Sequence, residues 1–232
     1  MRPVRRRRTG ARGPMTTREA TAALRTIRAV AASWQAPAVS FVAENSGTPF
    51  QILISTVLSL RTQDTTTTQA ARRLFALAGT PEAMLALDEA TIAQAIFPVG
   101  FYRQKARQIR EICRLLLERH GGEVPRELDA LLELPGVGRK TANLVVSLGY
   151  ALPGICVDTH VHRITNRWGY VETRTPGETE AALRGKLPRA YWIEINRLLV
   201  QFGQAICRPV SPWCSRCPVA RSCPRVGVTS AR

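Results

Sequence analysis

Three lysines, at positions 105, 140 and 186, stand among 33 basic residues, and every other basic residue is arginine. Lys140 directly follows the string Leu-Pro-Gly-Val-Gly-Arg at residues 134–139. A guanidinium stays charged in proteins, whereas a lysine amine is able to lose its proton and form a Schiff base with an electrophilic carbon. Lys140 is therefore a candidate nucleophile, and phosphate binding is the alternative role.

A carboxylate follows eighteen residues later, where Val157-Asp158-Thr159 begins a predicted helix. Asp is favoured just before a helix because it accepts hydrogen bonds from the free N–H groups of the first turn. A carboxylate in a cleft is also able to stabilise a positively charged sugar or to assist proton transfer. Asp158 is therefore a candidate catalytic residue as well as a helix cap, and His160 and His162 are interpreted as structural.

The residues before the lysine form a glycine-rich turn between two short helical segments. Its two glycines allow a close approach of the backbone to another surface, and the start of the next helix favours a phosphate. A tight connection between helices is the alternative. The full string resembles the helix-hairpin-helix element, which contacts the DNA backbone without reading sequence. This resemblance implies DNA contacts by Gly136, Val137, Gly138 and Arg139.

Four of the six cysteines lie within 17 residues near the C-terminus. We expect no disulfides, because no export signal is recognisable. Zinc sites usually combine two separated short pairs, whereas only one C-x2-C pair is present here. Four thiolates in a compact loop suit one [4Fe–4S] cluster, with zinc as the alternative. The candidate ligands are Cys207, Cys214, Cys217 and Cys223, whereas Cys113 and Cys156 are predicted to be buried.

The positive charge gathers at the two ends of the chain. The formal net charge is +16 at pH 7, and residues 1–18 and 207–232 hold seven and five arginines without any acid. This distribution favours a polyanionic partner, for which nucleic acid is the foremost choice. For residues 1–14, an arginine-rich composition with a solvated tail is the alternative. No apolar run approaches the ~20 residues that a bilayer requires, so we expect no membrane partner.

The hydrophobic periodicity is helical from Thr16 onward, and the alternation typical of strands is nearly absent. We therefore predict an all-α protein. Prolines and capping side chains mark several helix starts, as at Thr48-Pro49 and Thr175-Pro176. The predicted helices span residues 17–33, 48–60, 64–78, 81–86, 89–97, 102–120, 126–132, 138–149, 159–168, 177–185 and 189–203.

Two strings, at residues 134–143 and 157–167, together point to one family. They resemble the corresponding strings of endonuclease III, a family of helix-hairpin-helix DNA glycosylases, and the resemblance extends over about residues 17–223. It implies that Lys140 attacks C1′ of a damaged nucleotide, displaces the base and forms an imine, with assistance from Asp158. The imine then allows β-elimination of the 3′ phosphate. The spacing of the four cysteines also resembles the cluster loop of this family.

The resemblance implies a substrate of duplex DNA that contains oxidised pyrimidines or abasic sites. Such enzymes extrude the target nucleotide and fill the gap it leaves. The loops that would fill the gap are residues 58–64 and 99–102, where Arg61 and Phe101 replace the usual Gln and Leu of the family. These departures leave the lesion range and the opposite base open. We expect further DNA contacts by Gln63, Arg208 and Arg216, and we interpret Asp64 as a helix cap.

The same resemblance implies two helical domains with a DNA-binding cleft between them. Residues 42–153 would form a six-helix barrel that carries the hairpin turn, and residues 15–41 with 154–223 would form the cluster domain. Residues 1–14 are expected to be a disordered basic arm and residues 224–232 a tail. We expect a monomer that acts in the cytoplasm on the nucleoid, with organellar targeting by the basic N-terminus as the alternative.

Three other functions stay open at this point. A monofunctional glycosylase of the same family has another residue at the position of Lys140, which argues against that function. An abasic-site lyase with little glycosylase activity would use the same amine. A non-catalytic iron–sulfur module would use only the DNA-binding turn and the cysteines.

Overall fold

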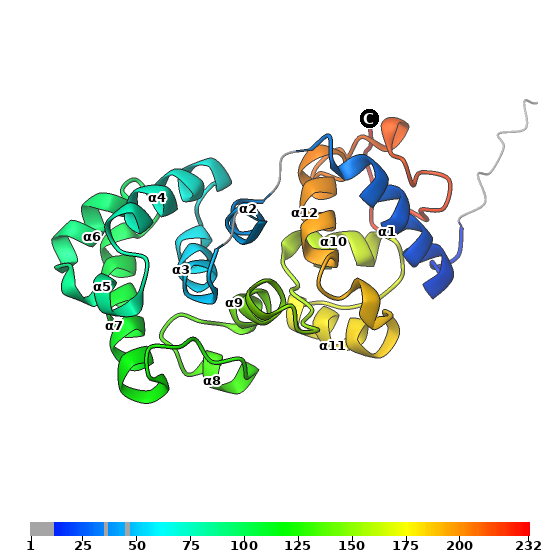
Figure 1. Cartoon of the computed structure of the whole chain (residues 1–232). Helices are drawn as coiled ribbons and strands as arrows, with labels where there is room; N and C mark the ends of the chain where they lie inside the picture. The colour runs from blue at the N-terminus through cyan, green and yellow to red at the C-terminus, as the bar shows by residue number, and fades with distance from the viewer. Residues whose placement is uncertain (1–11, 35–36, 45–46) are drawn as a thin grey trace, which may run out of the picture.

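The computed structural model describes residues 12–34, 37–44 and 47–232, so most of the expected basic arm, residues 1–11, lies outside the described residues. Within these ranges the regular elements are helices and there is no strand, which confirms the all-α prediction. A helix able to span a membrane is absent among the described residues. The helices form two lobes that lie side by side (Figure 1).

The first lobe contains α2 to α9, and the second contains α1 together with α10 to α12 (Figure 1). The helices are α1 Thr17–Ala31, α2 Ala38–Glu44, α3 Pro49–Ser59, α4 Asp64–Leu77, α5 Pro81–Ala86, α6 Glu89–Ile96, α7 Tyr102–His120, α8 Leu128–Leu132, α9 Arg139–Leu144, α10 Thr159–Arg167, α11 Pro176–Lys186 and α12 Ile195–Ala205. A π-helical turn, η1 Val145–Gly149, continues α9, and two 3-10 turns are η2 Arg189–Tyr191 and η3 Cys214–Arg216.

Side-chain caps determine where several helices begin. Thr48 forms a capping box with Gln51 at the start of α3, and Pro49 occupies the first turn. At the start of α11, the Thr175 side chain accepts a hydrogen bond from the backbone N–H of Glu178. The predicted starts at these two positions are confirmed, and each cap contributes about 1 kcal/mol.

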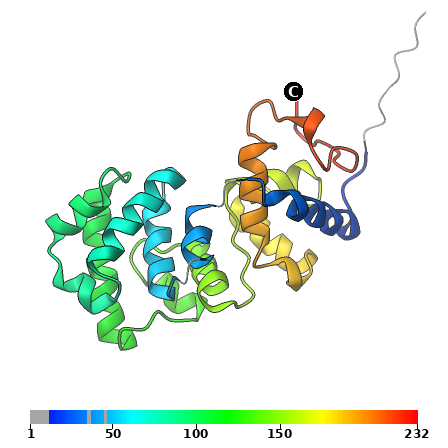
Figure 2. The ribbon, with the colours of Figure 1, turned by 45° about the horizontal axis from the view of Figure 1, so that its top comes forward.

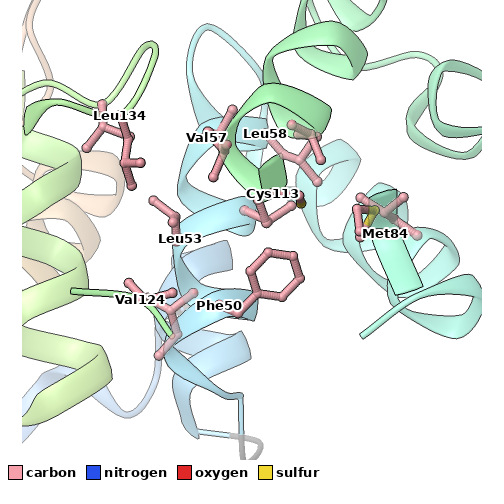
Figure 3. Packing of buried hydrophobic residues seen from close by; sticks show 14 of the residues in the cluster. Phe50, Leu53, Val57, Leu58, Met84, Cys113, Val124 and Leu134 are labelled. Carbon is pink, nitrogen blue, oxygen red and sulfur yellow. The ribbon is translucent and has the colours of Figure 1, made fainter. Parts of the chain in front are cut away.

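The core of the first lobe is built around α3, which is buried on all sides. Figure 3 shows its side chains packed against those of α5, α7 and the segment around Val124. A helix that is apolar around its circumference belongs in a core, which explains the unbroken apolar run of this segment. The residues of α3 that are at most 1% exposed include Ile52, Leu53, Ile54, Val57 and Leu58.

Cys113 of α7 packs in this first core, as predicted (Figure 3). The thiol is fully buried, and burial raises its pKa to about 12. Cys156 is also buried, at 1% exposure, and burial raises the pKa of this thiol as well. Both cysteines therefore act as small core residues.

The second core joins the N-terminal helix to the C-terminal half of the chain. Helix α1 lies alongside α12 in both views of the ribbon (Figures 1 and 2). Leu24 and Ile27 of α1 and Leu198 and Phe202 of α12 are each at most 1% exposed. The chain thus begins in the second lobe, builds the first lobe and then returns.

Two parts of the helix prediction are wrong. Helix α2 was not predicted, and the helix expected over 189–203 is instead the turn η2 followed by α12 from Ile195. Only seven residues long, α2 has an apolar face, carrying Val39, that packs in the first core. Tertiary packing therefore determines α2, since short isolated helices are marginal in water.

The boundary expected at residues 41 and 42 falls inside α2. Because Val39 belongs to the first core, we propose that the first lobe begins at Ala38. The chain crosses back between Val146, which lies in the first core, and Ile155, which lies in the second. These separate cores support an organisation into two helical domains.

The C-terminal segment contacts the second lobe. The N–H of Val226 donates to the Arg167 carbonyl over 2.9 Å, and the N–H of Arg232 donates to the Pro212 carbonyl over 2.8 Å. The Arg232 carbonyl in turn accepts the N–H of Ser215 over 2.9 Å. This segment is therefore part of the second lobe rather than a free tail.

Candidate functional site

Lys140 and Asp158 line one cleft of about 450 Å³ between the two lobes. Lys140 comes from α9 of the first lobe, and Asp158 precedes α10 of the second lobe. The structure thus brings the two candidate residues from the sequence to the same cleft. Other side chains that line the cleft include Ser40, Ser59, Thr62, Asp64, Leu144, His160, Asn196 and Gln204.

Lys140 is exposed, and its Nζ makes no hydrogen bond or ion pair with the described residues. The other two lysines differ: Lys105 Nζ donates to the Leu60 carbonyl and Lys186 Nζ donates to the Tyr170 carbonyl, each over 2.6 Å. Lys140 is therefore the lysine whose amine is available to a molecule in the cleft.

The turn before α9 brings its backbone to the surface. Gly136 has a φ of 71°, which strains any other residue, and a Cβ at this position would lie 1.5 Å from Gln108 Nε2 and displace that side chain. Gln108 Nε2 fastens the turn by donating to the Pro135 carbonyl over 2.9 Å. A Cβ at Gly138 would meet nothing, so the surface is open at the start of α9.

Two of the expected DNA contacts in this turn have other roles for their side chains. Val137 is 5% exposed and packs in the first core, so its side chain is not available to a ligand. Arg139 donates to Glu180 of α11 through Nε, over 3.1 Å, and through Nη2, over 2.9 Å. This bidentate ion pair joins the two lobes beside the lysine.

Glu180 sits almost buried between two arginines, with 5% of its side chain exposed. It also accepts a bond from Arg184 Nε over 3.1 Å, and Arg184 Nη2 donates to Asn143 Oδ1 of α9 over the same distance. Burial alone would raise the pKa of Glu180, but the bonds from Arg139 and Arg184 outweigh it and hold the pKa below its ordinary value. The cluster therefore fixes α9 against α11.

Asp158 caps α10 as predicted. Its Oδ1 accepts the backbone N–H groups of His160 and Val161, both over 2.9 Å. Its Oδ2 accepts no hydrogen bond from the described residues. Asp158 is half-buried, so this oxygen remains available to a molecule in the cleft. One oxygen thus holds the helix while the other is able to meet a substrate.

His160 and His162 make contacts within the second lobe. A Cβ at Gly203 would lie 2.2 Å from His160 Nδ1, which shows how closely α10 packs on α12 here. Burial lowers the pKa of His160, although the charge of Asp158 acts in the opposite direction, so the surroundings disfavour the charged imidazole. His162 Nδ1 lies 2.7 Å from Thr179 Oγ1.

Asp64 was interpreted as a helix cap, and this interpretation is wrong. Gln63 holds the capping position of α4 without a side-chain bond, and Asp64 is the first helical residue. The Asp64 carboxylate instead lines the cleft, where it accepts the Ala38 N–H over 3.3 Å and Gln204 Nε2 over 3.1 Å. Sequence gave no signal for this pair, because its members lie 140 residues apart.

The two expected gap-filling loops lie next to each other. Arg61 and Phe101 both adopt left-handed backbone angles, with φ of 54° and 59°, which are uncommon outside glycine. The Arg61 guanidinium lies 5.7 Å from the centre of the Phe101 ring, and Phe101 as a whole is 59% exposed. Gln63 is exposed as well, at the start of α4. Two protruding side chains therefore meet at the surface.

The four C-terminal cysteines line one cavity together with Trp168, Phe202, Arg225 and Val228. Burial raises the pKa of Cys217 to about 12, and the negative charges of the other three thiolates add to this effect. A cationic group between the four sulfurs would offset the negative charges that raise the pKa of Cys217. Side chains that converge on a single metal ion are absent among the described residues.

Arginines surround this cysteine cavity. Arg167 Nη1 donates to Cys207 Sγ over 3.3 Å, and Arg163 Nη2 donates to the Cys207 carbonyl over 2.8 Å. The Arg216 guanidinium lies 4.2 Å from the Trp213 ring centre. Arg208 is exposed and donates through Nε to the Gln204 carbonyl over 3.2 Å. The surface around the cavity is therefore strongly positive.

Comparison with known proteins gives a family and close relatives. Residues 54–189 match the model of the HhH-GPD superfamily of base excision DNA repair proteins. Endonuclease III of Thermotoga maritima is 50% identical over 175 residues, which cover 75% of this chain and 82% of the relative.

Two solved structures have similar folds. One is a non-covalent endonuclease III–DNA complex, with a TM-score of 0.79 and 34% identity over 90% of this chain and 95% of that one. The other is a trapped endonuclease III–DNA covalent intermediate, with a TM-score of 0.76 and 33% identity over 90% and 96% of the two chains.

Proposed function

This chain belongs to the HhH-GPD superfamily of base excision DNA repair proteins, and we propose that it excises oxidised pyrimidines from duplex DNA and cuts the strand at the resulting abasic site. It is a DNA glycosylase and abasic-site lyase. The observation that carries the proposed chemistry is the cleft that Lys140 and Asp158 share, although they come from different lobes.

Lys140 Nζ supplies the nucleophile in this proposal. Its lone pair attacks C1′ of the extruded nucleotide, and the bond from C1′ to the base breaks with its electron pair on the base, which takes up a proton. The ring oxygen then leaves C1′ and is protonated, which gives an iminium between Nζ and C1′. Loss of a proton from C2′ and departure of the 3′ phosphate form a C2′–C3′ double bond and cut the strand.

Asp158 would serve this sequence as the group that moves protons. Its carboxylate accepts the proton that the attacking amine releases and stabilises the positive charge that develops on the sugar. The capping bonds on Oδ1 hold the carboxylate in place during these steps. The half-buried position of His160 lowers its pKa and so disfavours a charged imidazole, and we assign no charge-stabilising role to it.

The DNA would lie across the turn and the two loops. The backbone N–H groups around Gly136 and Gly138 would bind a phosphate, since the start of α9 carries free donors and positive charge. Arg61 and Phe101 would fill the gap, with the guanidinium bonded to the unpaired base and the ring stacked between bases. Gln63, Arg208 and Arg216 would contact the flanking backbone.

The four cysteines would hold a [4Fe–4S] cluster. The cluster, when bound, would order the basic loop 207–223 against the DNA, and the chemistry of the cleft does not depend on it. Equal iron and sulfide contents without zinc in the purified protein would support this assignment, whereas zinc alone would refute it.

We expect the protein to act as a monomer on chromosomal DNA in the cytoplasm. Both the nucleophile and the carboxylate come from one chain, so the cleft needs no second copy. Equilibrium sedimentation at the mass of one chain, 25.6 kDa, would support the monomer, and a stable dimer would contradict it.

A panel of duplexes tests the proposed substrate. The panel contains an oxidised pyrimidine, an oxidised purine, a thymine mismatch and an abasic site. We expect cleavage of the oxidised pyrimidine and the abasic site, and Lys140→Gln should cleave neither. Cleavage of the abasic site alone would support the lyase alternative, and binding without cleavage would support a non-catalytic module.

A further inference from the structure

Lys105 is a buried lysine that the proposed chemistry does not use. It stands in the first turn of α7 and is 5% exposed. Its Nζ donates to the Leu58 carbonyl over 2.9 Å, to the Leu60 carbonyl over 2.6 Å and to Thr62 Oγ1 over 3.3 Å. Burial lowers the pKa of Lys105 to about 8, and no carboxylate compensates for it. The amine is therefore held away from water, which costs free energy, and it is bound to three acceptors between residues 58 and 62.

The same loop is tied to its neighbour through Thr62. Thr62 Oγ1 accepts the N–H of Gly100 over 3.2 Å, and the backbone N–H of Lys105 itself donates to the Phe101 carbonyl over 2.9 Å. A Cβ at Gly100 would lie 2.7 Å from the Arg61 carbonyl, so the two loops touch. Lys105 thus bonds to both loops, to one through its side chain and to the other through its backbone.

The residues at the tips of these loops need such support. Arg61 and Phe101 both have backbone angles in the left-handed region, where residues other than glycine are strained. Strained conformations persist only where the surrounding structure enforces them. The hydrogen bonds of Lys105 Nζ and of the Thr62 hydroxyl hold the backbone of both loops, and so enforce the conformations of Arg61 and Phe101.

We infer that Lys105 is a positioning residue that holds the loops of Arg61 and Phe101 as one preformed wedge for opening duplex DNA. This inference rests on the proposed function and deepens it. A preformed wedge spares the loss of loop freedom that would otherwise accompany insertion into the base stack. Lys105 is then needed where a nucleotide must leave a duplex, and it is dispensable where the abasic site lies in a single strand.

Two variants and two substrates test this role. Lys105→Met keeps the length of the side chain but removes its donors, and Thr62→Val removes the hydroxyl that joins the loops. The substrates are an oxidised pyrimidine in a duplex and an abasic site in single-stranded DNA. Lys186→Met is the matched control, because Lys186 Nζ also bonds to a carbonyl, that of Tyr170, but lies in the second lobe.

We expect both test variants to slow single-turnover cleavage of the duplex by about tenfold, or about 1.4 kcal/mol. In each variant this loss should exceed by about tenfold any change in borohydride trapping on the single-stranded abasic site, and Lys186→Met should change neither. Equal losses on both substrates in a folded variant, or unchanged cleavage of the duplex, would overturn the inference. If Lys105→Met does not fold, Thr62→Val decides the matter alone. A wild-type protein that traps neither substrate would instead refute the proposed function.

Discussion

At the level of single residues, the site depends on which side chains are left without partners. Lys105 and Lys186 are bound to carbonyl oxygens, whereas the amine of Lys140 and one oxygen of Asp158 have no partner among the described residues. Sequence identified Lys140 and Asp158 because each lies in a local string with a chemical reason. It could not identify Asp64 or Gln204, whose bond joins parts of the chain that no local pattern connects.

Asp158→Asn separates the capping role of this residue from its chemical role. Asn caps helices about as well as Asp, so thermal unfolding should change little. Loss of the carboxylate should lower the single-turnover rate of base release by about 100-fold. Asp158→Ala is the companion variant and should in addition lose about 1 kcal/mol of stability. Wild-type rates in Asp158→Asn would show that the carboxylate moves no proton.

At the level of elements, caps and apolar patterns predicted most helices, and packing decided the rest. Thr48 and Thr175 mark helix starts in any context, because their side chains bond to the next turn. Helix α2 lacks such a signal and forms where Val39 meets the first core. The π-helical turn after α9 also left no trace in the apolar pattern, which reads as one continuous helix.

The cluster of Glu180 with Arg139 and Arg184 predicts a pH-dependent contribution to stability. The pKa of Glu180 is lower in the folded protein than its ordinary value of 4.5, so its contribution is present above about pH 4.5 and is lost as the pH falls through the folded pKa. At pH 7, Glu180→Gln should lower the free energy of unfolding by about 1–3 kcal/mol, because two charged bonds are weakened.

Urea unfolding of the wild type and Glu180→Gln at a series of pH values measures this contribution. The difference between the two proteins should shrink as the pH falls below about 4.5. Glu178→Gln is a matched control on the same helix, since Glu178 is exposed and accepts the backbone N–H of Arg174, without an ion pair to a guanidinium among the described residues. A difference between wild type and Glu180→Gln that stays constant down to the lowest pH would contradict the assigned cause.

At the level of the whole molecule, the cleft exists because the chain returns to its starting lobe. Helix α1 packs with α12, so the residues before and after the first lobe form one second lobe (Figure 2). The arginines of the last 26 residues therefore belong to the same lobe as α1, the helix that follows residues 1–14 in the sequence. The summed positive charge of this lobe favours a phosphate backbone.

Deletion of residues 1–14 tests the share of the arm in DNA binding. The deletion removes six arginines, and each lost phosphate contact should reduce the slope of log Kd against log salt by about 0.9. Fluorescence anisotropy over a series of salt concentrations measures the slope. Replacement of the six arginines with lysine should preserve it. If the slope is the same after the deletion, the arm has no part in binding.

The residue that becomes covalently attached to DNA identifies the nucleophile directly. The protein is mixed with a duplex that contains an abasic site, the imine is reduced with borohydride, and the modified peptide is sequenced by mass spectrometry. We predict one adduct, on Nζ of Lys140, and no adduct in Lys140→Gln. An adduct on another amine of the wild-type chain, or trapping by Lys140→Gln at the wild-type rate, would contradict the assignment of the nucleophile.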